Sequence, residues 1–447
     1  EGIFIRWRYQ MKAGRQRRAI HIYASIFVLT ICIIAAIFVI SNVYPADTAR
    51  YPANAAIAQS VPSATTIQEA ASDTDAPTNN IPDAEAAWTF MVYINADDTA
   101  LEGPSINDFL EMASVGSNEN VNIVVQFDRA PGYDASYDDW TDCRRFLITE
   151  GLTPADGNEL MNIGEVNMGD PATLVDFVKW SVLSYPADKY ALIISSHGKG
   201  WEGCCWDETS SNDNMTLFEI GAGLGDISSF IGRPLDVVGF DACLMGMTEV
   251  AYEIRDYASV MIASEHAEPS SGWPYDAILA QLVETPEMDA AQLATNIVDI
   301  YHTSHAPTSY TMAAVDLTRI ESVIDSLGNL AQSLVVYAGT DSDPIKEYAG
   351  ALMTAINDAV ISEKHGIRWP GSYGLAIYFP KTRSEFNQAY SAAEVTLANV
   401  TAWDEFLHGY FTYSGDDWIT AAREGTQQYY VKEHVDLYDF CQKLIGE

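Results

Sequence analysis

Two short segments of the chain carry side chains that could form the catalytic pair of a hydrolase. Residues 195–201 contain His197, and residues 239–246 contain Cys243. Each segment follows an apolar, β-branched run that is typical of a buried parallel strand. A cysteine thiol needs a base to become a nucleophile at neutral pH, and histidine is the usual one. The two segments together indicate a cysteine hydrolase.

The strands that would position this pair alternate with helices along the chain. Strands are expected at 88–95, 121–127, 144–149, 190–195, 235–240, 259–263, 310–314 and 373–380. Helices are expected at 99–115, 171–183, 216–231, 244–256, 275–282, 289–302 and 318–337, with helix-like stretches at 403–411 and 435–443. This order predicts an α/β fold with a mostly parallel sheet and helices on both faces. In such sheets, sites form at the carboxyl ends of the strands.

The first part of the chain differs in composition from the rest. Residues 1–19 are basic, and residues 20–40 are apolar except for three polar side chains. A run of that length suits a bilayer span of about 20 residues and exceeds the roughly 7–15 residues of a cleaved signal core. We expect a short cytoplasmic segment at 1–19, a transmembrane signal-anchor at 20–43 and an extracytoplasmic body. A cleaved export signal, which would give a secreted protein, is the alternative.

The remaining organisation follows from composition. Residues 44–87 are rich in Pro, Ala, Ser, Thr and Asp, which is typical of a disordered stalk. The α/β domain is expected at 88–385 and a helix-rich C-terminal extension at 386–447. After residue 45 the chain has 18 basic and 61 acidic residues, within a formal net charge of −38. Such a body repels nucleic acid and suits an extracellular protein or one that binds cationic substrates.

The cysteines follow no disulfide framework. One of the six, Cys32, lies in the expected anchor, and five lie outside it: Cys143, Cys204, Cys205, Cys243 and Cys441. An odd number in an exported body leaves at least one free thiol, for which Cys243 is the candidate. A metal site formed by His197, Cys204, Cys205 and Cys243 has suitable ligand types, but its spacing is unlike that of paired zinc knuckles.

Each catalytic candidate also has a structural alternative. Cys243 lies directly before a predicted helix, whose dipole would stabilise a thiolate, but most free cysteines are small core residues. His197 could be a hydrogen-bonded structural residue at a strand end. Gly198 and Gly200 favour catalysis, because glycine lets backbone N–H groups approach an oxyanion closely.

With these motifs, the chain resembles the clostripain family of cysteine peptidases, in the clan of caspases, gingipains, legumains and separases. The resemblance rests on His197-Gly198 and on residues 241–245. Further matches lie at 88–97, 167–171, 185–188, 263–265, 272–275 and 373–380. The similarity covers roughly 88–385. It implies a caspase-like peptidase domain in which a Cys/His dyad, without a required third member, cleaves after basic residues.

The resemblance also implies a role for each matched residue. Cys243 would be the nucleophile that forms a thioester acyl-enzyme, and His197 would protonate the leaving amine. The oxyanion hole would consist of the backbone N–H groups of Gly198 and Cys243. Asp241 would bind the Arg or Lys side chain of the substrate, since residues two apart on a strand face the same side. Its alternative role is to cap the helix predicted at 244.

The substrate pocket has one further candidate. Trp273 would form a wall of the pocket along the aliphatic stem of the substrate, or it is a buried structural tryptophan.

The chain departs from the family pattern in two features, and it has one main alternative function. Ser196 stands where relatives commonly carry an acid or amide, so the orientation of the histidine ring is open. No Lys or Arg occurs between Gly200 and Arg233, which argues against self-cleavage in that loop. A catalytically inactive, surface-anchored binding protein of the same fold is the main alternative function.

The resemblance requires no cofactor but leaves calcium open, because the namesake of the family depends on it. Candidate ligands are the acidic groups at 207–208, at 213 and at 341–343. Such groups are more often solvated loops than cation sites.

Overall fold

The computed structural model describes residues 81–446, except residues 99, 308, 338–342, 393 and 413–432. The segments predicted at 1–19 and 20–43, and most of the stalk predicted at 44–87, lie outside the described residues. Among the helices of the described part, none is long and apolar enough to cross a bilayer.

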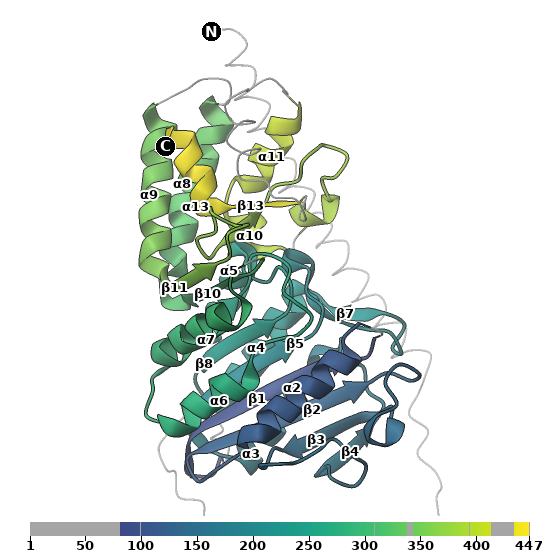
Figure 1. The fold of residues 1–447 in the computed structure, drawn as a ribbon. Helices are drawn as coiled ribbons and strands as arrows, with labels where there is room; N and C mark the ends of the chain where they lie inside the picture. The colour runs from purple at the N-terminus through teal and green to yellow at the C-terminus, as the bar shows by residue number, and fades with distance from the viewer. Residues whose placement is uncertain are drawn as a thin grey trace, which may run out of the picture. The chain divides into compact units, whose positions relative to one another are not determined.

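A nine-stranded sheet forms the centre of the described residues, in the order β11-β10-β9-β8-β5-β1-β2-β3-β4 (Figure 1). Its strands are β1 (Ala86–Ala96), β2 (Val121–Arg129), β3 (Cys143–Leu147), β4 (Met161–Gly164), β5 (Ala187–Ser195), β8 (Leu235–Asp241), β9 (Ala258–Ala263), β10 (Thr311–Asp316) and β11 (Val360–His365). Two small antiparallel pairs join β6 (Cys204–Asp207) to β7 (Asp213–Met215) and β12 (Ala376–Tyr378) to β13 (His434–Asp436).

The middle of the sheet is parallel and its two edges are antiparallel. The neighbouring strands β9, β8, β5, β1 and β2 all pair in parallel. The strands β3 and β4 at one edge, and β10 and β11 at the other, pair antiparallel. The predicted mostly parallel α/β sheet is therefore confirmed in its centre. The strand predicted at 373–380 belongs instead to the small β12–β13 pair.

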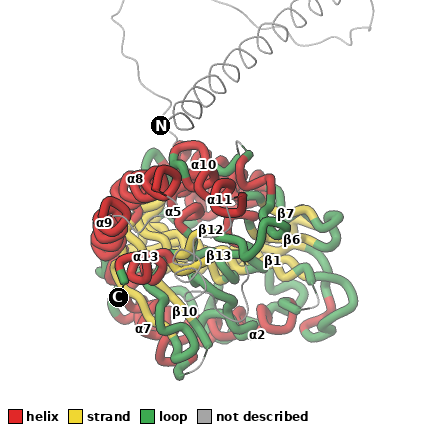
Figure 2. Tube along the Cα trace, turned by 90° about the horizontal axis from the view of Figure 1, so that it is seen from above, coloured by secondary structure: helices red, strands yellow, loops and turns green. Residues whose placement is uncertain are grey.

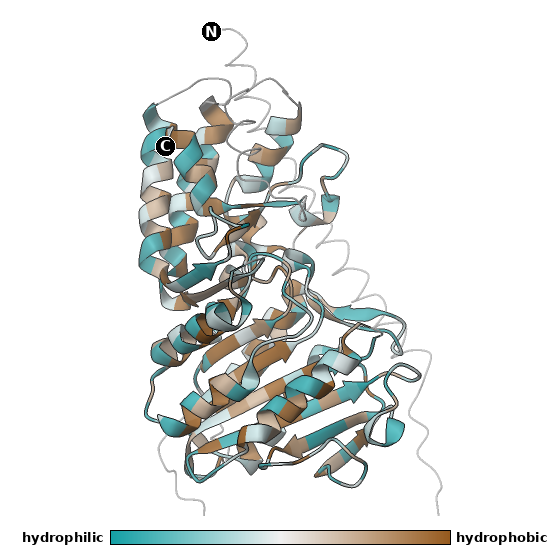
Figure 3. Ribbon diagram, viewed as in Figure 1, coloured by the Kyte–Doolittle hydropathy of each residue, from teal (hydrophilic) through white to brown (hydrophobic). Residues whose placement is uncertain are grey.

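Alternating side chains of the sheet enter two separate cores. On β1, Met91 and Tyr93 pack into one core, whereas Phe90, Val92 and Ile94 pack into the other. This alternation is the period of two that a strand imposes. Apolar segments accordingly lie along the strands and on the inner sides of the helices (Figure 3).

Helices cover both faces of the sheet, as predicted (Figures 1 and 2). The helices are α2 (Glu102–Val115), α3 (Pro171–Ser184), α4 (Leu217–Ile231), α5 (Thr248–Ile254), α6 (Tyr275–Glu284), α7 (Ala290–His305), α8 (Ile320–Tyr337), α9 (Asp343–Ala359), α10 (Thr396–Val400), α11 (Trp403–Thr412) and α13 (Leu437–Ile445). Helices α2, α6 and α7 pack on the core that contains Phe90, and α3, α4, α5, α8 and α9 pack on the core that contains Met91.

The residues after 385 are tied to the sheet-bearing part of the chain. Strand β13 pairs with β12 from Tyr378↔His434 to Ala376↔Asp436. Helix α13 buries Phe440, Cys441 and Leu444 in the same core as helix α9. The C-terminal segment therefore contributes to a shared core.

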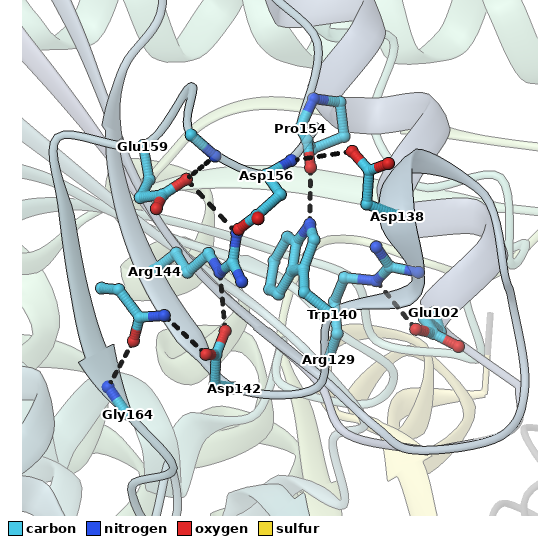
Figure 4. A network of polar contacts seen from close by, with 12 residues as sticks. Glu102, Arg129, Asp138, Trp140, Asp142, Arg144, Pro154, Asp156, Glu159 and Gly164 are labelled. Atoms are coloured by element: carbon cyan, nitrogen blue, oxygen red, sulfur yellow. Dashed lines mark hydrogen bonds and ion pairs between the residues drawn. The ribbon is translucent and has the colours of Figure 1, made fainter.

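A network of paired charges surrounds Trp140 near the β3 edge of the sheet (Figure 4). The guanidinium carbons of Arg129 and Arg144 lie 4.7 and 4.5 Å from the centre of the indole ring. Arg129 donates to Glu102 at 2.8 Å, and Arg144 donates to Asp142 at 2.6 Å. Each buried guanidinium here has a carboxylate partner.

Candidate active site

The carboxyl ends of three neighbouring strands bring the predicted catalytic residues to one edge of the sheet. In the parallel register, Ile94 of β1 is opposite Ser195 of β5, and Ser195 is opposite Asp241 of β8. His197 follows β5 and Cys243 follows β8. Both residues therefore lie at the carboxyl ends of the central parallel strands. Both line one cavity of about 110 Å³.

Asp98, which sequence reasoning did not single out, holds the imidazole of His197. His197 Nε2 lies 2.8 Å from Asp98 Oδ2. The other carboxylate oxygen of Asp98 accepts the N–H groups of Ala100 and Leu101, which fixes the carboxylate in place. The hydrogen bond that His197 donates to Asp98 raises the pKa of His197. The pairing leaves Nδ1 of the ring to exchange protons with reacting atoms, and it provides the orientation that Ser196 left open.

The backbone around Cys243 differs from the prediction. Helix α5 begins at Thr248, and Leu244 has a left-handed φ of 68°. The expected helix start at 244 is therefore wrong, and no helix N-terminus lies directly at the thiol. The sulfur instead accepts the backbone N–H of Glu268 at 3.3 Å.

Burial raises the pKa of the Cys243 thiol, against the lowering effect of the Glu268 N–H. At neutral pH the Cys243 side chain is therefore a thiol.

The glycines after His197 allow the two catalytic segments to touch. A Cβ on Gly198 would lie 2.3 Å from the carbonyl oxygen of Cys243, which is closer than atoms can approach. Gly200 has a φ of 62°, and its Cβ would lie 2.2 Å from Met247 Sδ. Any larger residue would push the histidine loop away from Cys243. The backbone of Gly198 therefore lies against that of Cys243, where the oxyanion hole was predicted.

Three carboxyl groups line the cavity beside the catalytic pair. They come from distant parts of the sequence: Asp108 of α2, Asp241 of β8, and Glu268 of the segment after β9. Asp108 and Asp241 are 4% and 7% exposed. Only Asp241 was predicted. No Lys, Arg or His among the described residues forms an ion pair with any of the three.

Asp241 is a buried strand residue and not a helix cap, so the capping alternative is wrong. One of its oxygens accepts the backbone N–H of Trp273 at 3.2 Å and the hydroxyl of Tyr275 at 3.0 Å. Burial raises the pKa of Asp241 to about 6. These donors hold the carboxylate toward the cavity.

The other two carboxyl groups of the cavity, those of Asp108 and Glu268, each have one oxygen that accepts no hydrogen bond from the described residues. Oδ1 of Asp108 and Oε1 of Glu268 are buried without a partner among the described residues. Burial and the neighbouring Asp241 raise the pKa of both groups. A cation entering the cavity would supply the missing partner and favour ionisation.

Trp273 lies behind the cavity. It is fully buried in the core and is not among the residues that line the cavity. Its indole N–H donates to Glu268 Oε2 at 3.2 Å, and its ring lies against Gly239. This position matches the structural alternative, with an added role in orienting Asp241 and Glu268.

The described cysteines form no metal site with His197. All five described cysteines are free thiols, and Cys204 and Cys205 are buried in the hydrophobic core. Within the described residues, the set whose geometry could hold a metal ion is purely acidic: Asp97, Asp128, Glu165 and Asp207. The Cys/His metal site considered above therefore has no geometric support.

This carboxylate cluster, Asp97, Asp128, Glu165 and Asp207, lies at the edge of the sheet that carries the catalytic pair. One oxygen from each lies within 4.8 Å of the others. Both oxygens of Asp128 are buried without a partner among the described residues, whereas backbone N–H groups hold both oxygens of Asp207. Burial, followed by contact with Asp207, raises the pKa of Asp97 to about 6.

The geometry of this cluster fits a hard cation. Oxygens on opposite sides of a calcium ion with bonds of about 2.4 Å would be about 4.8 Å apart. Of the acidic groups predicted as ligands, only Asp207 belongs to the cluster. Glu208 and Asp213 accept hydrogen bonds from Tyr133 and Asn167. Residues 341 and 342 lie outside the described residues.

Comparison with known proteins agrees with the resemblance in the sequence. The family model of the clostripain family, Peptidase C11, matches residues 92–444. Clostripain of Hathewaya histolytica is 32% identical over 222 residues, which cover 43% of this chain and 42% of that protein. The chain thus spans less than half the length of this relative.

Solved structures of C11 proteases share the fold. A secreted C11 cysteine protease from Bacteroides thetaiotaomicron, in complex with an irreversible peptide inhibitor, has a TM-score of 0.57 at 17% identity. The match covers 71% of this chain and 100% of that one. An inactive zymogen C11 protease from Parabacteroides distasonis has a TM-score of 0.53 at 18% identity, covering 73% of this chain and 99% of that one.

Proposed function

The chain belongs to the clostripain family of cysteine peptidases, and from this premise we propose that it is an endopeptidase that cuts proteins or peptides after Arg or Lys. The single observation that supports this function is the cavity beside the strand ends. His197 and Cys243 line it together with the buried carboxyls of Asp108 and Asp241 and the half-buried Glu268, none of which has a cationic partner among the described residues. A nucleophile, a base and an anionic pocket are the parts that such a reaction needs.

In the proposed reaction, the sulfur of Cys243 attacks the scissile carbonyl carbon and its proton passes to His197. The oxyanion accepts hydrogen bonds from the backbone N–H groups of Gly198 and Cys243. The C–N bond then breaks, and His197 returns the proton to the leaving nitrogen. Water attacks the remaining thioester, its proton passes through His197 to the sulfur, and the acid product leaves.

Asp98 supports this cycle by holding the imidazole. It accepts from Nε2 at 2.8 Å, so Nδ1 faces the proton transfers. Asp98 also stabilises the imidazolium that forms while the tetrahedral intermediate exists. Because burial raises the pKa of the thiol, the proton moves to His197 together with the attack.

The pocket would select a cationic side chain before the scissile bond. Asp108, Asp241 and Glu268 hold buried oxygens that water does not reach freely. A guanidinium offers five donors in a planar fork and an ammonium offers three, and both bring the opposite charge. A neutral side chain would leave those oxygens unpartnered, which disfavours its binding.

We also propose that the carboxylate cluster holds a calcium ion as a structural cofactor. One carboxylate oxygen from each of four separate segments lies within 4.8 Å of the others, and both oxygens of Asp128 have no other partner among the described residues. Calcium accepts such all-oxygen, carboxylate-rich sites, whereas magnesium keeps several waters and usually takes one or two carboxylates. Asp97 precedes Asp98 in the chain, so the ion would stabilise the strand end that carries the partner of His197.

For localisation, we propose that residues 20–43 anchor the protein in a membrane and that residues 44–87 extend the peptidase domain outside the cytoplasm. The apolar run and the basic residues on its cytoplasmic side support this placement. Alkaline carbonate extraction of membranes tests it, because an anchored chain stays in the pellet. Release of the full-length chain would contradict the anchor.

Fluorogenic peptides that differ only in the residue before the cut test the proposed activity. We expect Cys243→Ala to reduce turnover to background. We expect Asp241→Asn to lose about a hundredfold in kcat/KM on Arg and Lys substrates, because it removes one charge from a buried pair, and far less on neutral ones. Asp226→Asn, at an exposed position of α4, is the matched control.

Two outcomes would contradict the proposal. If Asp241→Asn lowers kcat/KM equally on all substrates, Asp241 does not determine the preference for a basic residue. No turnover of any peptide, with no labelling of Cys243 by an arginyl chloromethyl ketone, would favour the inactive binding protein.

A further inference from the structure

A second cavity adjoins the catalytic histidine. It has a volume of about 250 Å³ and is lined by Asp98, Ala100, His197, Trp206, Glu208 and Asn212. Ala100 and His197 also line the first cavity, whereas Cys243 and the three pocket carboxyls line only the first. His197 therefore stands between the two cavities, with Cys243 on one side only.

The chemistry of acyl transfer assigns the two cavities to the two halves of a substrate. The acyl half stays bonded to sulfur, so its side chain occupies the cavity that contains Cys243. The leaving amine receives its proton from His197, so the residue after the cut lies on the histidine side. Resting on the proposed function, we infer that the second cavity binds the side chain of the residue after the cut and prefers Lys or Arg there.

Glu208 provides the charge for this preference. Its side chain is exposed and accepts the hydroxyl of Tyr133 at 2.9 Å, but it forms no ion pair with a described Lys, Arg or His. Asp98, the other carboxylate of the cavity, is paired with His197 at 2.8 Å. Glu208 is thus the carboxylate of this cavity whose charge remains available to a ligand.

Trp206 provides a surface for the aliphatic stem and the charged end of the same side chain. The ammonium of Lys199 already lies 5.7 Å from the centre of the Trp206 ring, within the range of a cation–π contact. Lys199 is itself paired with Glu202 at 2.9 Å, so its charge is offset locally. A tryptophan beside a free carboxylate suits an Arg or Lys side chain better than an acidic one.

Together the two cavities favour cleavage between two consecutive basic residues.

The preference for the residue after the cut can be measured separately from acylation, by letting different amines compete with water for the acyl-enzyme. A peptide ester with Arg before the bond, and no residue after it, loads Cys243. Argininamide, norleucinamide and glutamic acid α-amide then compete with water for the thioester. We expect argininamide to capture the acyl group about fivefold better than norleucinamide, the upper end for an exposed ion pair, and the acidic amide worst.

Glu208→Gln should reduce the ratio of argininamide to norleucinamide capture to below twofold. Glu150→Gln, at an exposed position outside both cavities, should keep the full ratio. Equal capture of argininamide and norleucinamide by the wild type would overturn the inference, as would an unchanged ratio in Glu208→Gln. Failure of the enzyme to hydrolyse the ester at all would instead overturn the proposed function.

Discussion

The buried carboxylates of this protein have two different surroundings. Near Trp140, Glu102 is 1% exposed and pairs with the fully buried Arg129 at 2.8 Å (Figure 4). At the catalytic edge of the same sheet, Asp108 and Asp241 are nearly as buried, yet neither pairs with a described basic residue. In the carboxylate cluster, both side-chain oxygens of Asp128 are buried without a hydrogen-bond partner among the described residues.

The difference shows where this protein leaves room for a ligand. A buried unpaired charge costs several kcal/mol, so a fold selected for stability alone would pair it or replace it. The Glu102–Arg129 pair is complete within the chain. The cavity beside His197 and Cys243 and the carboxylate cluster have no such partner among the described residues, and the proposed function supplies it as the substrate side chain and a calcium ion.

The largest effect is expected from breaking the completed pair. Glu102→Gln leaves Arg129 buried without its countercharge, and we expect a loss of about 3–5 kcal/mol in the free energy of unfolding. Asp241→Asn retains an oxygen for Trp273 and Tyr275 and removes a charge that lacks a partner, so we expect a loss of less than about 1 kcal/mol. Urea denaturation of both variants measures the contrast. Similar losses would mean that the two surroundings do not differ energetically.

Calcium should raise the free energy of unfolding by supplying the carboxylate cluster with the cation that it lacks. At a calcium concentration of 100 times the dissociation constant, we expect a stabilisation of about 2.7 kcal/mol over the chelated protein. Asp128→Asn should abolish this gain, and it should stabilise the chelated form because it removes a buried carboxyl whose pKa burial raises. Asp226→Asn should keep the gain. Thermal unfolding of the Cys243→Ala protein, with terbium luminescence as a second readout, makes the test independent of activity.

An Asp128→Asn variant that still gains full stability from calcium would place the ion elsewhere. If calcium stabilises neither Asp128→Asn nor the Asp226→Asn control, the proposal that the protein binds calcium is wrong.

In the substrate pocket, the unpaired carboxylate of Asp108 can be compared with a paired carboxylate by its effect on activity. Asp108→Asn removes a carboxylate that has no cationic partner, so we expect about a thirtyfold loss of kcat/KM on Arg substrates, the lower end for a buried charge pair. Asp142→Asn removes a carboxylate that already pairs with Arg144, and kcat/KM should stay within twofold. Steady-state kinetics on one Arg peptide measures both. An unaffected Asp108→Asn would exclude this carboxylate from the pocket.

The central fold could be predicted from the sequence because its strands are strongly apolar. The runs at 190–195 and 235–240 gave the positions of β5 and β8 and the edge at which His197 and Cys243 meet. The helix expected at 244–256 was wrong in its start, because Leu244 adopts a left-handed φ and the chain turns before Thr248. Propensity does not specify such a turn, since tertiary packing around Gly246 and Met247 fixes it.

The site was predictable only in part, because half of it comes from distant segments. His197 follows β5, Asp241 ends the adjacent strand β8 and Cys243 follows it. The rule that sites form at the carboxyl ends of parallel strands therefore located all three. The same rule applied to the ends of β1 and β2 would have selected Asp97, Asp98 and Asp128. Asp108 and Glu268 come from a helix and a loop. Only their packing against Asp241 brings them to the cavity, and no spacing in the sequence encodes that contact.

The smallest expected effect is a pH dependence of specificity. Burial raises the pKa of Asp241 to about 6 in the free protein. Above that pH the group is ionised and attracts a cationic side chain, whereas below it the group is neutral and that attraction is lost.

The ratio of kcat/KM for an Arg peptide to that for a matched Gln peptide isolates this effect, because protonation of His197 and Cys243 affects both peptides equally. We expect the ratio to fall about tenfold between pH 7 and pH 5, as about nine-tenths of the carboxylate becomes protonated. In Asp241→Asn the ratio should fall less over that range, since the remaining change comes from Asp108 and Glu268, whose pKa values burial also raises. A ratio that rises toward low pH, or one that changes equally in both proteins, would show that another group controls the recognition of the basic side chain.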